Sequence, residues 1–486
     1  MSNRESVKHH SGDMVWNASF LIGIASLLWF LIRTGTKPRR AAYPCQKAAL
    51  ANASAWLSTL ALPAFLRKPR LGSAQLRFGL LFLASAAVAG IAGPAVRFFS
   101  NMSSQPIGQF VAPGLAGRQQ SASTFADIYA IQGTTGADGG FHRLVRLMEQ
   151  SGQSFYALID RSDVVIIKVN SQWDQRGGTN TDLVKAIVES LLAHPDGFNG
   201  EIVIADNGQA QYGAAGRGGD LDWRSNNAVD RTQSMQKVAD LFSKGHRVST
   251  ALWDRITTTR VGEYADGDSR DGYVVGSSPS AATGIIVSYP KFKTRYGTFV
   301  SFKKGIWNPA SRTYDSDRLK VINVPVLKTH SIYGVTASVK HYMGVTSDIL
   351  TRHAAHRSVG SGGMGVQMAE TRFPVLNILD AIWINAVPGG GPLTRYSQAT
   401  QTNIVAASRD PVALDYWAAK NILLPAAKKL GYRNTDSMNP DIVQTGSFGN
   451  WLRLSMKALQ DAGYSVTLDL SKVNITVSSL EDFKLE

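Results

Sequence analysis

Cysteine is nearly absent from this chain of 486 residues, and its scarcity limits the chemistry that the protein can carry. Cys45 is the one cysteine. A single chain therefore forms no internal disulfide bond and cannot supply the several thiolates that hold an iron–sulfur cluster. We expect no protein-bound iron–sulfur cluster.

Common nucleotide-binding and nucleophile signatures are also missing. The sequence has no G-x-x-x-x-G-K-[ST] phosphate loop and no G-x-S-x-G elbow. The glycine-rich segments 360–365 and 389–392 do not follow the strand–loop–helix order of a dinucleotide-binding unit. We interpret them as flexible loops, in which backbone N–H groups can approach a ligand closely.

Acidic residues are scarce in the first 100 residues, which hold 12 Lys or Arg against 2 Asp or Glu. The other 386 residues hold 39 against 34. Most of the formal charge of +15 therefore surrounds the apolar N-terminal segments, where basic residues fix membrane topology. We expect no nucleic-acid partner.

The N-terminal 100 residues read as a membrane region. Residues 14–32 and 78–96 are uncharged stretches of 19 residues, long enough to cross a bilayer. Residues 48–66 are apolar but interrupted by polar residues, and they predict a weak span or an interfacial helix. With two spans, the nine Lys and Arg between residues 33 and 77 favour the cytoplasm, which places the C-terminal domain outside it. With three spans, the domain would face the cytoplasm.

The remaining chain predicts an α/β fold, an open and mostly parallel sheet with helices on both faces. Residues 101–159 read as a linker and lead-in segment, and residues 160–486 as the α/β domain. Apolar runs at 163–169 and 201–206 predict buried strands, and apolar residues at helical spacing between them predict a helix over 181–192. Residues 212–318 are less regular and predict an insertion, or a lid over the sheet edge.

The segment 323–344 carries more reactive side chains than any other. A β-branched run ends in Lys328, Thr329 and His330, and Lys340 and His341 follow closely. Ligand sites in open α/β sheets lie beyond the carboxyl ends of the strands. A lysine, a hydroxyl group and an imidazole at such an end can hold an anion or move a proton.

A second strand end adds to this site. Lys168 and Asn170 close the predicted strand 163–169, and alternate residues of a strand face the same side. Lys168 and Lys328 converging on one crevice would suit a carboxylate or a phosphate. The alternative is that each lysine is a solvated strand end.

Two aspartates are candidates to orient or activate groups in the crevice. Asp206 closes the second strand, where it is a general base, a metal ligand or the cap of a turn. Asp415 lies in an apolar helix, and a buried carboxylate needs a partner. We expect that partner to be a lysine or histidine of the crevice. Asp410, before Pro411, is predicted to cap the same helix.

Four histidines fall within 27 residues and raise the alternative of a divalent metal site. His353 and His356 are spaced so that both can face one way on a helix. Their spacing matches no defined metal signature, however. The candidate metal ligands are His330, His341, His353 and His356.

These fragments together resemble the domain of unknown function 362 family over roughly residues 160–430. The N-terminal segment 36–46 is similar to that of membrane-anchored bacterial members, which implies the bacterial inner membrane. Some relatives carry a ferredoxin-like module, which this chain lacks. The segments that carry the resemblance are V-V-I-I-K-V-N (164–170), T-N-T-D (179–182), I-V-I-A-D-N-G (202–208), V-I-N-V-P-V-L-K-T-H (321–330), S-V-K-H-Y-M-G (338–344), L-D-A-I (379–382) and A-S-R-D-P-V-A-L-D (407–415).

The leading hypothesis is a membrane-anchored α/β enzyme that binds an anionic small molecule and uses acid–base chemistry, such as hydrolysis. A non-catalytic ligand-binding or envelope-organising module and a histidine-cluster metalloprotein are the alternatives. The predicted ligand-binding residues are Lys168, Asn170, Lys328, Thr329 and Lys340, and the predicted catalytic residues are His330, His341, Asp206 and Asp415.

Overall fold

The computed structural model describes residues 126–209 and 218–480. All of them lie in one compact unit, Gly108–Glu486. The predicted spans at 14–32, 48–66 and 78–96 lie outside the described residues. Within the described part, no helix has the length and apolar character needed to cross a bilayer.

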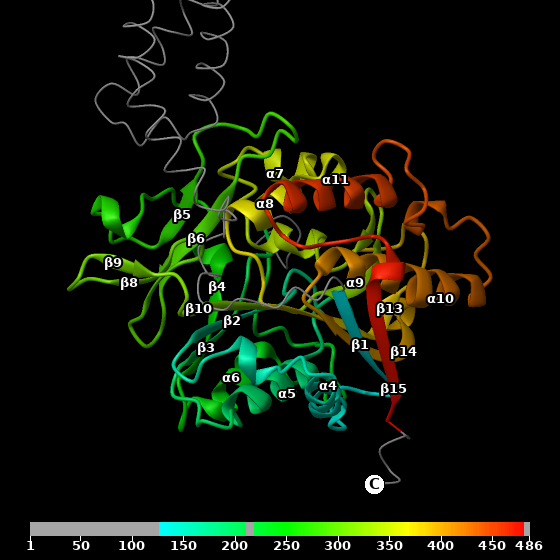
Figure 1. Cartoon of the computed structure of the whole chain (residues 1–486), viewed down its shortest axis with the longest axis horizontal. Coiled ribbons are helices and arrows are strands. Elements are labelled where there is room, and N and C mark those ends of the chain that lie inside the picture. The colour runs from blue at the N-terminus through cyan, green and yellow to red at the C-terminus, as the bar shows by residue number, and fades with distance from the viewer. Residues whose placement is uncertain (1–125, 210–217, 481–486) are drawn as a thin grey trace, which may run out of the picture. The chain divides into compact units, whose positions relative to one another are not determined.

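A large mixed sheet forms the centre of the domain (Figure 1). Its main path runs β15-β1-β14-β13-β10-β2-β3-β4, and β11 and β12 extend it beside β13. The prediction of an α/β fold is confirmed, but the sheet is mixed because β14 runs antiparallel to both β1 and β13. The strands are β1 (Ala126–Gln132), β2 (Val164–Lys168), β3 (Glu201–Asp206), β4 (Val248–Leu252), β10 (Leu319–Asn323), β11 (Val326–His330), β12 (Gly334–Thr336), β13 (Leu376–Asn385), β14 (Thr400–Ser408) and β15 (Val473–Ser479).

Helices cover both faces of this sheet, as predicted. Figure 1 shows α4, α5 and α6 on one face and α8, α9, α10 and α11 on the other. The helices are α4 (Gly140–Gln150), α5 (Thr181–Leu192), α6 (Met235–Phe242), α7 (Ala354–Arg357), α8 (Gly363–Glu370), α9 (Pro411–Ala418), α10 (Leu424–Lys429) and α11 (Phe448–Asp461). The predicted caps are present, because Asn180 accepts from Leu183 N and Asp410 accepts from Val412 N.

The central strands are apolar on both faces because both faces are covered. In β2, Val164 and Ile166 pack into the core under α8–α11, whereas Val165 and Ile167 pack into the core under α4–α6. This is why the run 163–169 shows no polar alternation. The sheet therefore holds the ends of β2 and β3 rigidly.

Two predicted boundaries are wrong. The described part of the predicted linker and lead-in segment, 126–159, contains β1, which pairs with β14 and β15 inside the main sheet, and helix α4. The α/β domain therefore starts no later than Ala126. The predicted insertion 212–318 contains α6 and β4, which pairs with β3 in the main sheet. The irregular composition concealed these elements because both are short.

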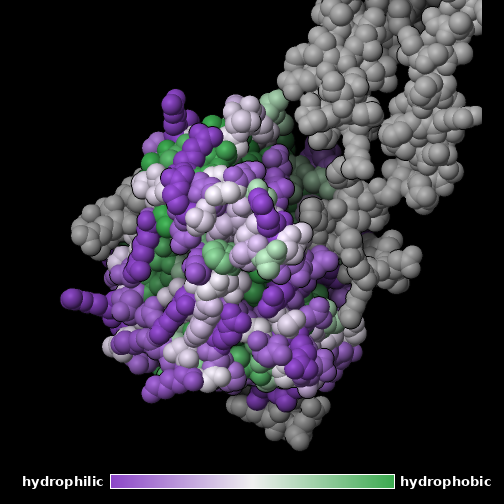
Figure 2. All heavy atoms as spheres, turned by 90° about the vertical axis from the view of Figure 1, so that its left-hand side faces the viewer, coloured by the Kyte–Doolittle hydropathy of each residue, from purple (hydrophilic) through white to green (hydrophobic). Residues whose placement is uncertain are grey.

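The rest of that insertion forms a second, antiparallel sheet of five strands. Its buried carboxylate, Glu263, accepts hydrogen bonds from the hydroxyl groups of Tyr289, Ser301 and Tyr314. Hydrophilic side chains dominate the described surface on the side of the molecule where this sheet lies (Figure 2). The strands are β5 (Gly272–Val275), β6 (Ser288–Lys293), β7 (Phe299–Ser301), β8 (Gly305–Asn308) and β9 (Thr313–Asp315).

Candidate functional site

The candidate site lies at the carboxyl ends of β2 and β3, near the point where β11 follows β10 along β13. β2 and β3 are parallel neighbours, so Lys168 and Asp206 end at the same edge. The β-branched run that leads to Lys328 forms two strands, β10 and β11, which are separated at Val324–Pro325 because Pro325 has no N–H to continue the ladder. The chain restarts as β11, which brings Lys328 toward the same edge.

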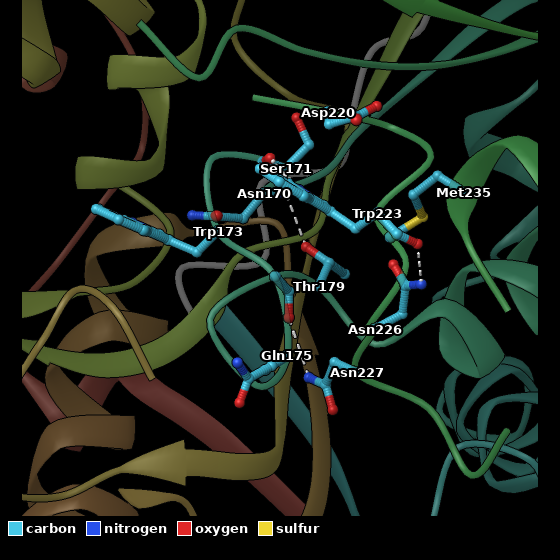
Figure 3. Close-up of a pocket in the computed structure, with 11 residues that line it drawn as sticks. Asn170, Ser171, Trp173, Gln175, Thr179, Asp220, Trp223, Asn226, Asn227 and Met235 are labelled. Carbon is cyan, nitrogen blue, oxygen red and sulfur yellow. Dashed lines mark hydrogen bonds between the residues drawn. The ribbon is translucent and has the colours of Figure 1, made fainter. Parts of the chain in front are cut away.

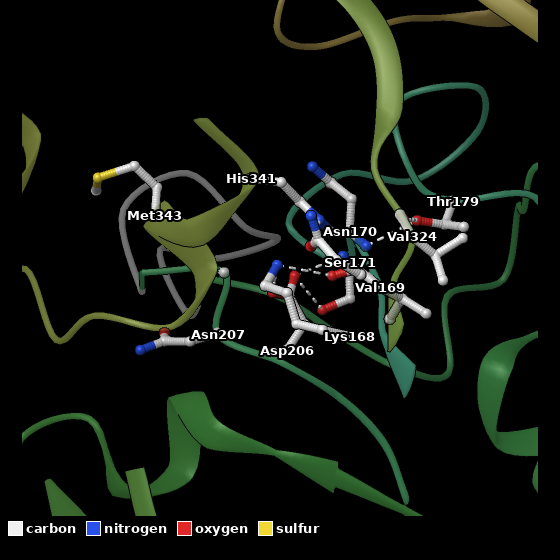
Figure 4. Close-up of polar contacts among 12 residues, drawn as sticks. Lys168, Val169, Asn170, Ser171, Thr179, Asp206, Asn207, Val324, His341 and Met343 are labelled. Carbon is white, nitrogen blue, oxygen red and sulfur yellow. Dashed lines mark hydrogen bonds and ion pairs between the residues drawn. The ribbon is translucent and has the colours of Figure 1, made fainter. Parts of the chain in front are cut away.

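Lys168 and Asp206 form a buried ion pair. Lys168 Nζ lies 2.8 Å from Asp206 Oδ1 and 3.1 Å from the Val169 carbonyl oxygen. Ser171 donates to Asp206 Oδ2 from its backbone N (2.7 Å) and its Oγ (3.1 Å). Figure 4 shows these side chains pointing toward one another, with His341 and Asn170 in the same cluster. Burial lowers the pKa of Lys168, and the charge of Asp206 opposes that shift.

Gly344 closes over this ion pair. A Cβ atom at Gly344 would lie 2.2 Å from Asp206 Oδ1 and 2.4 Å from Lys168 Nζ. The Gly344 carbonyl also accepts from Asn207 N at 3.2 Å. The glycine that ends the V-K-H-Y-M-G segment is therefore required by close approach, since any side chain would meet the pair.

Two further lysines lack an ion-pair partner among the described residues. Lys328 Nζ donates to the Gly177 carbonyl at 2.5 Å, and Lys340 Nζ lies 5.4 Å from the centre of the Tyr333 ring. Burial and, to a smaller extent, the charge of Lys340 lower the pKa of Lys328 to about 7, against the attraction of Asp206 and Asp380. Burial lowers the pKa of Lys340 to about 8. Both ammonium groups are thus poised to lose or gain a proton near neutral pH.

A chain of hydrogen bonds fixes the proton of His341. Asn377 Nδ2 donates to the Ser408 carbonyl (3.2 Å), so Asn377 Oδ1 is the atom that accepts from Asn323 Nδ2 (2.9 Å). Asn323 Oδ1 therefore faces His341 Nδ1 (2.8 Å), which must donate. Burial lowers the pKa of His341 well below the usual value, and the charges of Lys168 and Lys328 add to that effect, whereas a backbone hydrogen bond with Val169 opposes it. His341 is therefore neutral, and no described residue donates to its Nε2.

His330 has the opposite arrangement. Its Nδ1 accepts from the backbone N of Ile332 (3.1 Å) and of Tyr333 (3.2 Å), so the proton of the neutral ring sits on Nε2. Burial lowers the pKa of His330, and the charge of Lys340 contributes. His330 is therefore a hydrogen-bond donor through Nε2, whereas His341 is an acceptor.

The predicted partner of Asp415 is wrong. Its carboxylate accepts from two backbone groups, Ser338 N at 2.7 Å and Val339 N at 2.9 Å, instead of a crevice lysine or histidine. These groups begin the 3₁₀ helix Lys340–Gly344. Burial raises the pKa of Asp415 to about 7. Asp415 is thus a positioning residue for Lys340 and His341.

Asp415→Ala is expected to lower the free energy of unfolding by about 3 kcal/mol, because two buried N–H groups lose their acceptor. Thermal unfolding of the full-length protein checks this. Asp441→Ala is the control, since Asp441 pairs with Lys420 at the surface and such pairs contribute about 1 kcal/mol or less. Equal losses in both variants would show that Asp415 does not anchor the segment.

The two remaining predicted ligand-binding residues differ in their surroundings. Thr329 Oγ1 accepts from Gly391 N at 3.1 Å, in the glycine-rich loop 389–392. Asn170 Oδ1 is buried and receives no hydrogen bond from any described residue. Asn170 also borders a small pocket of about 10 Å³, and Figure 3 shows Asn170, Thr179 and Asn227 around it.

Over residues 305–420 the chain matches the family described as domain of unknown function (DUF362). This match over residues 305–420 supports membership of the DUF362 family. The matched segment includes β11, the 3₁₀ helix with Lys340 and His341, and α9 with Asp415. No curated protein and no solved structure matches the chain.

The four candidate metal ligands do not come together in the DUF362 segment. His353 Nδ1 and His356 Nδ1 lie 2.8 and 4.0 Å from Asp348 Oδ2. The His330 and His356 rings are 6.5 Å apart, and His341 faces Asn323 instead. In the described parts of the chain, no group of three or more His, Cys, Asp or Glu side chains is arranged to hold a metal ion.

Asp380, Asn323 and Ser171 belong to the site but were not predicted as site residues. Asp380, in β13, accepts from Asn180 N (2.8 Å) and from Ile382 N (3.1 Å), and burial raises its pKa to about 6. Asn323 orients His341, and Ser171 orients Asp206. Asp380 and Asn323 are polar residues inside apolar runs, which is a signal that the sequence offers, since buried polar groups need partners. Ser171 carries no such signal.

Proposed function

We propose that this DUF362 protein is a membrane-anchored enzyme that binds an anionic small molecule between its lysines and moves protons in an acid–base step. The soluble domain is proposed to lie on the extracytoplasmic side of a bacterial inner membrane. The hydrophobic stretches and the basic region between residues 33 and 77 support that placement.

One observation carries the proposal: the site holds more lysines than carboxylates that pair with them. Three lysines gather at one sheet edge, but within the described residues only Lys168 has a carboxylate oxygen within 4.0 Å. A buried ammonium group is costly unless it is paired. A bound carboxylate or phosphate would supply the missing charge for Lys328 and Lys340.

The proton chemistry follows from the two lysine pKa values. A group titrating near the working pH can both accept and release a proton efficiently. Lys328, with a pKa of about 7, meets that requirement, and His341 Nε2 offers a neutral acceptor in the same cluster. The His330 Nε2–H and the Lys340 ammonium group donate hydrogen bonds to the negative charge that develops on the ligand during the acid–base step.

Isothermal titration of full-length protein with inorganic phosphate, and separately with malate, tests this proposal. At about pH 8 we expect saturable binding with uptake of about one proton, because Lys328 and part of Lys340 are neutral there and a bound anion raises both pKa values. Affinity should fall as the pH rises above about 8, where the free lysines lose their charge. Heats in two buffers of different ionisation enthalpy measure the uptake. Binding of neither anion, or binding without proton uptake, would contradict the proposal.

A further inference from the structure

Two buried atoms near the Lys168–Asp206 ion pair have no hydrogen-bond partner among the described residues. His341 Nε2 and Asn170 Oδ1 are buried, and no described residue donates to either atom. Both side chains lie beside the Lys168–Asp206 pair in Figure 4. A simple anion offers only acceptors, so it would satisfy the lysines and leave these two atoms unpaired.

His341 cannot correct this mismatch by changing its tautomer. Moving the proton to Nε2 would leave Nδ1 bare against Asn323 Oδ1, two acceptors at 2.8 Å. Turning the Asn323 amide would break its bonds to the Ser338 carbonyl (3.1 Å) and to Asn377 Oδ1. Nε2 is therefore held as an acceptor by contacts that extend through Asn377 to β14.

No lysine donates to either atom in the arrangement observed. Lys168 Nζ is bonded to Asp206 and to the Val169 carbonyl, and Lys328 Nζ is bonded to the Gly177 carbonyl. An unpaired buried acceptor costs about 1–3 kcal/mol. A ligand that brings a donor to this place recovers that cost, whereas one without a donor leaves it.

We infer that the ligand of this site carries an O–H or N–H donor beside its negative charge, and that His341 Nε2 and Asn170 Oδ1 accept from it. The inference rests on the anion-binding function proposed above and narrows it. Hydroxycarboxylates and monohydrogen phosphates or phosphate monoesters with a neighbouring hydroxyl group have this chemistry. Fully deprotonated anions without a donor do not.

Two matched pairs of anions test the inference on the unaltered full-length protein. At about pH 8, monohydrogen phosphate carries one P–OH group, whereas sulfate has the same shape and charge without a proton. Malate and succinate likewise differ by one hydroxyl group. We expect phosphate to bind at least about tenfold more tightly than sulfate, or malate at least about tenfold more tightly than succinate. The pair that discriminates identifies the source of the negative charge.

Substitutions at the acceptors give a second readout. His341→Phe and Asn170→Ala should each reduce the ratio of the affinities for the donor-bearing and the donor-free anion. Thermal unfolding shows whether each variant is folded. Asn170→Ala keeps the test valid if His341→Phe fails to fold, because Asn170 lies outside the Asn323–Asn377 chain.

The outcomes separate this inference from the proposal on which it rests. Equal binding of both members of each pair, lost in Lys328→Met, would overturn the donor requirement and leave the anion site standing. Binding of no anion at all would overturn both. A preference for sulfate or succinate would contradict the donor requirement alone.

Discussion

Lys328→Met is expected to stabilise the folded domain, even though it removes the centre of the proposed site. Burial lowers the pKa of Lys328 from 10.5 to about 7. That shift corresponds to about 5 kcal/mol of folding free energy at neutral pH, part of which methionine recovers. Functional sites commonly carry such costs, and their removal raises stability at the expense of activity.

The sign of the pH dependence follows from the direction of the shift. Below about pH 7 Lys328 is charged in both states, so the wild type carries the full burial cost. Between about pH 7 and 10.5 the unfolded chain binds more protons than the folded one, and wild-type stability rises with pH. The advantage of Lys328→Met should therefore be largest near pH 6 and smallest near pH 10.

Unfolding of full-length protein across this pH range measures the effect. Lys185→Met is the control, because Lys185 is 40% exposed on α5 and pairs with Glu189 only at 3.8 Å. That variant should stay within about 0.5 kcal/mol of the wild type at every pH. A Lys328→Met variant that is less stable than the wild type near pH 6 would show that burial of Lys328 does not lower the free energy of unfolding.

Gly344→Ala is expected to damage the site severely. Its Cβ would lie 2.2 Å from Asp206 Oδ1 and 2.4 Å from Lys168 Nζ, so the buried pair must separate or the backbone must move. Overpacking costs about 1–3 kcal/mol, and disrupting a buried ion pair costs about 3–5 kcal/mol. We expect a loss of at least about 3 kcal/mol in the free energy of unfolding and loss of phosphate binding.

A second glycine of the matched DUF362 segment provides the control. A Cβ atom at Gly360 would meet nothing closer than 3.9 Å, and neither glycine has a positive φ angle. Gly360→Ala should therefore leave stability and binding nearly unchanged. Similar effects of the two substitutions on thermal unfolding would show that close approach to the ion pair does not decide the role of Gly344.

Local sequence patterns predicted the elements that are apolar and continuous. β2, α5 and β3 follow one another with the expected boundaries, since each is buried in a covered sheet. β1 was missed because its partners, β14 and β15, lie more than 260 residues further along the chain. Such pairings depend on the whole fold, so a short stretch of sequence does not predict them.

The sequence predicted which residues lie in the site better than it predicted the role of each residue. Lys168, Lys328, Lys340 and His341 do gather at one sheet edge. The role of Asp415 was mistaken because sequence does not show backbone groups that need an acceptor. His330 and His341 also carry their protons on different ring nitrogens, because of hydrogen bonds between segments that are distant in the sequence. Residue spacing does not predict such bonds.

The most direct measurement of the central claim is the phosphate titration of Lys328→Met beside Lys185→Met and the wild type, at about pH 8 in two buffers. The wild type and Lys185→Met should bind with the same affinity and take up about one proton. The Lys328→Met variant should show no binding heat, and its unfolding curve should show that it is folded. Retained binding and proton uptake in Lys328→Met would contradict an anion site built on this lysine.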